Sequence, residues 1–129
     1  LPFITLQGRS DYALIFHGAN IYPEHVRQAL DHPIFHKKIT GKFIMRKNHD
    51  SRMNIRFMVY VELRPHSETS NALKTALEKQ ILNHLMLVNK EYKDMISHVP
   101  GDVTPHVKLC SYQDIVYFKP GLKPKYILK

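Results

Sequence analysis

Residues 8–30 read GRSDYALIFHGANIYPEHVRQAL. This stretch joins a Gly-Arg-x-Asp turn to an apolar strand, a second glycine and a helix that begins at a proline. Gly8 and Gly18 allow backbone conformations or close approaches that a side chain would forbid. Pro23 suits the first turn of a helix, and Glu24 is well placed near the positive end of that helix. Each feature alone is ordinary turn chemistry, but their order is specific.

The order of these residues resembles the hinge motif of the adenylate-forming enzymes, a superfamily of acyl-CoA synthetases, luciferases and peptide-synthetase adenylation domains. Within it the likeness is to phenylacetate-CoA ligases, whose pattern runs roughly Gly-Arg-x-Asp-Asp, an apolar strand, Gly-x-Asn-Ile/Val-Phe/Tyr-Pro, then a helix. The residues of this chain that match are Gly8, Arg9, Asp11, Gly18, Asn20, Ile21, Tyr22 and Pro23. Two positions depart from the pattern, since Tyr12 replaces the second Asp and Arg27 stands where a helix Glu is common.

The resemblance implies roles for residues of this stretch. Arg9 would bind the ribose and phosphates of a nucleotide, and Asp11 would be the hinge between an adenylation pose and a thioester-forming pose. A loop would line the channel through which the coenzyme A thiol reaches the acyl-adenylate, and it consists of His17, Gly18, Ala19 and Asn20. From spacing alone, Asp11 could equally cap the turn, and Gly18 could serve a tight strand-to-helix connection.

The C-terminal tail, residues 117–129, reads YFKPGLKPKYILK. Members of the superfamily carry a catalytic lysine near the C-terminus, after a glycine and before an aliphatic and a basic residue. A lysine suits this role because its ammonium group neutralises charge at the α-phosphate and carboxylate as the adenylate forms. The candidates are Lys125, which we prefer, and Lys123. Neither directly follows a glycine, so a solvated basic tail is the alternative.

The formal net charge of +8 permits a polyanionic partner but does not identify one. The basic residues are scattered along the chain, and no zinc-finger, RNA-binding-sheet or Gly-x-x-Gly clamp signature accompanies them, which argues against nucleic acid. His32 and His36 lie four residues apart, yet Pro33 interrupts any helix that would aim both at one ion, so no metal site is predicted.

The single cysteine, Cys110, excludes an internal disulfide and agrees with a reducing cytoplasm. Its apolar neighbours indicate a buried strand position and an inert thiol. No apolar run approaches the roughly 20 residues that a membrane-spanning helix needs. We therefore expect a cytoplasmic protein without a membrane partner.

Hydrophobic periodicity predicts the order strand, helix, strand, strand, helix, strand. The expected strands are 12–16, 38–47, 54–64 and 106–110, and the expected helices are 23–30 and 71–96. This order predicts an α+β fold, a small two-layer sandwich with helices on one face of a mainly antiparallel sheet. The resemblance implies the same build, with a leading segment and hinge over residues 1–11 and a C-terminal lid domain over residues 12–129. The large N-terminal domain would lie outside this chain.

The leading hypothesis is the mobile C-terminal domain of an ATP-dependent acid-CoA ligase, which forms an acyl-adenylate and then an acyl-CoA thioester. The resemblance implies ATP with Mg²⁺ bound mainly by the domain outside this chain, coenzyme A as co-substrate, and the chain's own N-terminal adenylation domain as partner. The substrate would be an aryl or arylacetic acid, and the isolated chain would be inactive. Two alternatives stay open: a free-standing basic α+β module that binds nucleic acid or protein, and a ligase-derived domain whose adenylate passes to an amine or a reductase.

Overall fold

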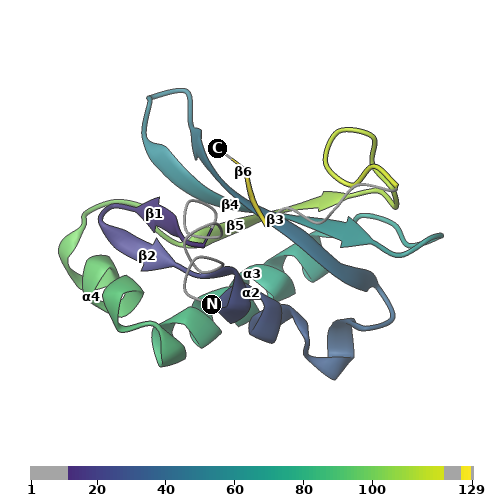
Figure 1. The fold of residues 1–129 in the computed structure, drawn as a ribbon, viewed down its shortest axis with the longest axis horizontal. Helices are drawn as coiled ribbons and strands as arrows, with labels where there is room; N and C mark the ends of the chain where they lie inside the picture. The colour runs from purple at the N-terminus through teal and green to yellow at the C-terminus, as the bar shows by residue number, and fades with distance from the viewer. Residues whose placement is uncertain (1–11, 121–125, 129) are drawn as a thin grey trace, which may run out of the picture.

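The computed structural model describes residues 12–120 and 126–128, which form a layer of helices packed against a sheet (Figure 1). The helices are α2 (Pro23–Leu30), α3 (Asn71–Val88) and α4 (Lys90–His98), with a short 3-10 helix, η2 (Pro33–Phe35), after α2. The strands are β1 (Leu14–Phe16), β2 (Ala19–Ile21), β3 (Ile39–His49), β4 (Ile55–Leu63), β5 (Pro105–Cys110) and β6 (Ile127–Leu128). None of these helices combines the length and apolar character that a bilayer crossing requires.

The larger sheet has the strand order β5-β4-β3-β6, and the helices cover one of its faces (Figure 1). The predicted α+β class and the one-sided helix layer are confirmed. The pairing is mixed rather than mainly antiparallel, because only β3 and β4 pair antiparallel, whereas β5 joins β4 and β6 joins β3 in parallel. The reason for the first parallel pair is the connection: α3 and α4 return the chain to the end of the sheet at which β4 began.

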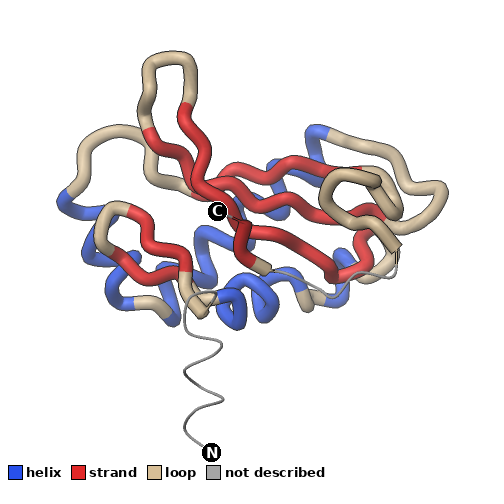
Figure 2. The backbone as a smooth tube through the Cα atoms, turned by 45° about the horizontal axis from the view of Figure 1, so that its top comes forward, coloured by secondary structure: helices blue, strands red, loops and turns tan. Residues whose placement is uncertain are grey.

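The sequence analysis did not predict β2, η2, β6 or the division of the long helix into α3 and α4. Residues 17–20, expected as a loop, contain the start of β2, so that β1 and β2 form a small hairpin apart from the larger sheet (Figure 2). The helix expected over 71–96 is interrupted at Asn89, whose backbone is extended with φ −117° and ψ 100°. Asparagine side chains compete with helical hydrogen bonds and favour the residue just before a helix, which explains why α3 ends and α4 begins there.

The core matches the alternation read from the sequence. Residues Phe57, Val59 and Val61 of β4 are fully buried and face the helices, where the α3 side chains Leu77 and Ile81 pack against them. The side of β3 that carries Ile39, Phe43 and Met45 is also buried. A smaller apolar cluster occupies the opposite face of the sheet and consists of Ile44, Tyr60, Cys110 and Phe118. The segment after β5 supplies Phe118 and so covers this second face.

Candidate functional site

The β1–β2 hairpin carries the residues expected to line a coenzyme A channel. Phe16 pairs with Ala19, which leaves His17 and Gly18 as a two-residue turn with φ values of 49° and 83°. Positive φ at both positions defines the tight hairpin turn that matches the twist of its strands, and glycine adopts it without steric cost. The base of the hairpin is buried and its tip is exposed. The fold therefore leaves His17 and Gly18 exposed to solvent at the tip of the hairpin.

Two side chains at the start of α4 fix the backbone of Asn20. The amide nitrogen of Asn20 donates to Glu91 Oε1 at 2.8 Å, and its carbonyl oxygen accepts from Asn89 Nδ2 at 2.9 Å. Asn89 is only 4% exposed, and its Oδ1 also accepts from the amide of Tyr92 at 3.0 Å. One buried amide side chain thus caps α4 and holds the hairpin, so the position of the tip depends on α4.

Of the predicted site residues, the structure describes the four expected to line a coenzyme A channel, His17, Gly18, Ala19 and Asn20, and places them in this hairpin. Arg9, Asp11, Lys123 and Lys125 lie outside the described residues, and their roles stay predictions. Sequence reasoning missed Asn89 and Glu91. The signal that could have found them is an asparagine within a long helical pattern, since asparagine is a preferred residue at a helix N-terminus.

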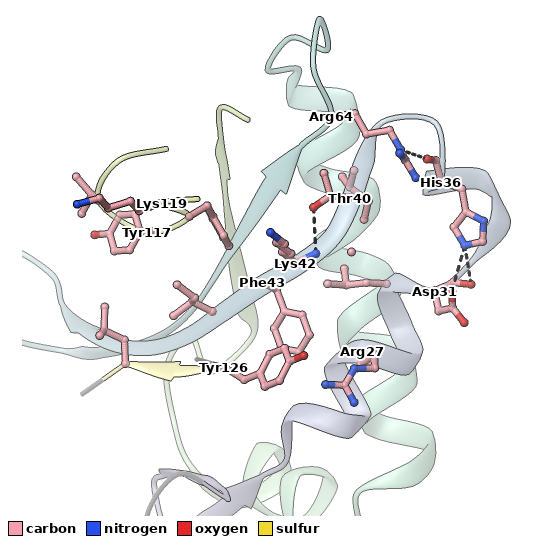
Figure 3. Close-up of a pocket in the computed structure, with 17 residues that line it drawn as sticks. Arg27, Asp31, His36, Thr40, Lys42, Phe43, Arg64, Tyr117, Lys119 and Tyr126 are labelled. Carbon is pink, nitrogen blue, oxygen red and sulfur yellow. Dashed lines mark hydrogen bonds and ion pairs between the residues drawn. The ribbon is translucent and has the colours of Figure 1, made fainter. Parts of the chain in front are cut away.

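A second feature is a cavity of about 900 Å³ between α2, the first half of β3 and the described C-terminal residues 116–119, 126 and 128 (Figure 3). Its cationic side chains are Arg27, Lys42, Arg64 and Lys119, and its aromatic ones are Phe43, Tyr117, Phe118 and Tyr126. Lys119 and Tyr126 are the described lining residues on either side of the segment that contains both candidate lysines. Tyr126 directly follows Lys125 in the sequence.

Arg27, one of the two departures from the ligase pattern, belongs to this cavity. Its guanidinium carbon lies 4.7 Å from the ring centroid of Tyr126, within the range of a cation–π contact. Its Nη1 also donates to Glu24 Oε1 at 2.6 Å. The ring of Tyr126 lies 5.0 Å from that of Phe43 (Figure 3). Arg27 thus helps to anchor the chain immediately after Lys125.

The residue types in the cavity wall give it a positive character. Burial, followed by a hydrogen bond with Tyr60, raises the pKa of Tyr117. The one carboxylate among the described lining residues is Asp31, whose Oδ1 lies 3.2 Å from His36 Nε2.

Neither His36 nor His32 joins a set of metal ligands, since the described part of the chain has no group of three or more His, Cys, Asp or Glu side chains that could hold an ion.

Comparisons with known proteins identify the fold. Neither a protein-family model nor a curated protein sequence matches this chain. A crystal structure of a domain of phenylacetate-coenzyme A ligase from Bacteroides vulgatus ATCC 8482 does resemble it, with a TM-score of 0.52 and 21% sequence identity. The likeness covers 93% of this chain and 95% of that one. The chain therefore has the fold of a ligase domain, as the residues of its hinge-like stretch led us to expect.

Proposed function

We propose that this chain is the C-terminal domain of an ATP-dependent acid-CoA ligase of the phenylacetate-CoA ligase type. The observation that carries the proposal is the shared fold with such a ligase domain over 93% of the chain. The chain combines that fold with the Gly-x-Asn-Ile-Tyr-Pro pattern of residues 18–23, which lies at the hairpin and at the start of α2. The acid is an aryl or arylacetic acid bound by the N-terminal adenylation domain, which we also assign the Mg²⁺–ATP complex.

The hairpin tip supports a role in the thioester-forming step. A Cβ atom built on Gly18 would meet no other atom within 4 Å, so the space beside this residue is open. Gly18 therefore serves the backbone turn and does not make room for a packed neighbour of its own domain. A slender pantetheine arm could pass at close range, while Asn89 and Glu91 hold the hairpin in place through the backbone of Asn20.

In this proposal the tail lysine acts in the first half-reaction. The ammonium group of Lys125, or of Lys123, neutralises charge at the α-phosphate and carboxylate while the acyl-adenylate forms and pyrophosphate leaves. Rotation about Asp11 then exchanges this pose for the one in which the hairpin faces the adenylate. The coenzyme A sulfur attacks the acyl carbon, AMP leaves, and the acyl-CoA thioester is formed.

Two assays on the complete protein that contains this chain separate the half-reactions: acid-dependent exchange of pyrophosphate into ATP, and CoA-dependent formation of the thioester. Gly18→Leu is expected to slow thioester formation by about 10-fold or more, because a side chain narrows the channel, and to leave pyrophosphate exchange unchanged. The matched control is Gly101→Leu, since Gly101 also has positive φ (93°) and no atom within 4 Å of a built Cβ. Equal effects of the two variants would refute the channel role.

The lysine role is tested with the first assay alone. Lys125→Ala is expected to lower pyrophosphate exchange about 100-fold, as the loss of a charge-stabilising group does in other enzymes. Lys123→Ala tests the second candidate, and Lys108→Ala, at an exposed position of β5, is the control. A wild-type protein that shows no acid-dependent exchange with any aryl or alkyl acid would refute the ligase proposal as a whole.

A further inference from the structure

We propose that Glu91, an exposed residue of α4, is a positioning residue for the thioester-forming step alone. This role rests on the proposed function, since it concerns the hairpin that we assign to the coenzyme A channel. It adds to that function by linking one residue outside the hairpin to one of the two half-reactions. In this role Glu91 contacts neither substrate nor reacting atoms. It acts through the backbone of Asn20, whose amide nitrogen donates to Glu91 Oε1 at 2.8 Å.

The outer edge of β2 pairs with no other strand of the described chain, and two side chains of α4 take the place of one. In a hairpin with a two-residue turn, the residues next to the turn exchange backbone hydrogen bonds, and the following pair, Ile15 and Asn20, does not. The amide and carbonyl of Asn20 therefore point away from β1, toward α4 (Figure 1), where Glu91 and Asn89 bind them. These side chains satisfy backbone groups that a third strand would otherwise pair.

The two bonds at Asn20 fix the direction in which the hairpin tip points. The base of the hairpin packs into the core through Phe16, whose ring centroid lies 5.9 Å from that of Phe57. Apolar packing is non-directional, whereas hydrogen bonds require a narrow range of angles. Gly18 lies two residues from Asn20, which is about 7 Å of extended chain. A change at this anchor therefore displaces the tip directly.

Glu91 is the better of the two anchoring residues for separating position from stability. Asn89 is buried and also caps α4, so its loss affects the fold as well as the hairpin. Glu91 is exposed, and within the described part of the chain no cationic side chain forms an ion pair with it. Its side chain is thus engaged by the amide of Asn20 and not by a salt bridge. Substitution of an exposed residue of this kind changes stability little.

The test uses the complete protein that contains this chain and follows both half-reactions. Glu91→Ala is expected to lower kcat/KM for coenzyme A by about 10-fold, because a misplacement of about 1 Å costs up to roughly 100-fold. Pyrophosphate exchange and the KM values for acid and ATP are expected to stay within about 2-fold of the wild type. Glu91→Gln keeps an oxygen that accepts from the Asn20 amide, so its kcat/KM for coenzyme A should stay within about 3-fold.

The matched control is Asp94→Ala, which removes a carboxylate from another exposed position of α4. Its hydrogen bonds among the described residues run from its carbonyl oxygen to neighbours in the same helix, so both half-reactions should be unchanged. Hydrogen exchange of residues 14–21, followed by mass spectrometry, tests the anchor without any substrate. Glu91→Ala should speed exchange at the Asn20 amide, whereas Glu91→Gln and Asp94→Ala should not.

Any of four results would overturn the proposal. They are an alanine variant of Glu91 within about 2-fold of the wild type toward coenzyme A, equal losses in both half-reactions, a glutamine variant as slow as the alanine variant, and unchanged exchange at Asn20. Equal losses would indicate a general structural role, and a slow glutamine variant would assign the effect to charge. Failure of the ligase proposal is distinguishable, because the wild type would then show no acid-dependent pyrophosphate exchange, while hydrogen exchange would still report whether Glu91 holds the hairpin.

Discussion

The dual role of Asn89 gives a sharp prediction about stability. Asn89→Ala removes the oxygen that caps α4 at Tyr92 and the amide group that donates to the carbonyl of Asn20. Loss of an N-cap side chain costs about 1 kcal/mol. The carbonyl of Asn20 also loses its partner at a partly buried position, which costs about 1–2 kcal/mol more. We expect Asn89→Ala to lower the free energy of unfolding by about 2–3 kcal/mol, a large part of the roughly 5–15 kcal/mol of a typical domain.

Urea unfolding followed by far-UV circular dichroism measures this loss, which corresponds to a fall in Tm of about 10 °C for a domain of this size. Asn89→Ser separates the two contributions, because a serine hydroxyl retains the cap but does not replace the amide donor. It is expected to lose about half as much stability. The control is Asn83→Ala, at an exposed position within α3, which is expected to be neutral or slightly stabilising.

The reasoning would be refuted in any of three ways. An Asn89→Ala variant within about 0.5 kcal/mol of the wild type would show that neither contact matters. A serine variant as unstable as the alanine variant would show that the cap of α4 does not contribute to stability. A serine variant as stable as the wild type would show that the hydrogen bond to the Asn20 carbonyl does not contribute. Hydrogen exchange at the Asn20 amide gives a local readout, since release of the hairpin should speed it.

Three other predictions concern buried polar groups. Burial raises the pKa of the Cys110 thiol to about 11, so about 0.1% is thiolate near pH 8; a disulfide reagent should label the native chain slowly and the denatured chain at once, and fast native labelling would contradict the buried position. Burial, followed by the charge of His84, lowers the pKa of His25 against the opposing effect of Glu24. The imidazole of His25 therefore takes up a proton more readily in the unfolded chain than in the folded one. As a result, the free energy of unfolding is highest above about pH 6.5 and decreases as the pH drops through the folded-state pKa of His25. In urea titrations at several pH values, His25→Gln should reduce this decrease in the free energy of unfolding. His49→Gln, at an exposed site, should leave the decrease unchanged. Tyr92→Phe removes the hydroxyl that donates to the carbonyl of Val103 at 2.8 Å, so it should cost about 1–2 kcal/mol in the same titrations, and an unchanged midpoint would show that this bond contributes nothing.

Much of the fold could be predicted from local patterns. Alternation along β4 and the inward side of β3 follow from the two-residue period of a strand, and the apolar stripe of α3 follows from the helical period of 3.6. The turn at Gly18 is likewise encoded locally, because its backbone conformation favours glycine. These features depend on neighbours in the sequence, so the sequence alone specifies them. The same holds for the hinge-like motif, whose resemblance to ligases agrees with the fold that was found.

The sequence by itself therefore determined the class of the fold, the faces of its main strands and helices, and the position of the turn at Gly18. Only the tertiary structure decided how the parts join: the parallel placement of β5 and β6, the break at Asn89 and the cavity. Asn89 bonds to Asn20, 69 residues away, and the cavity unites Arg27 with Leu128. Such contacts follow from the path of the chain across the sheet and from the burial of a shared core. No local period or propensity encodes that path, because it is a property of the packed chain as a whole.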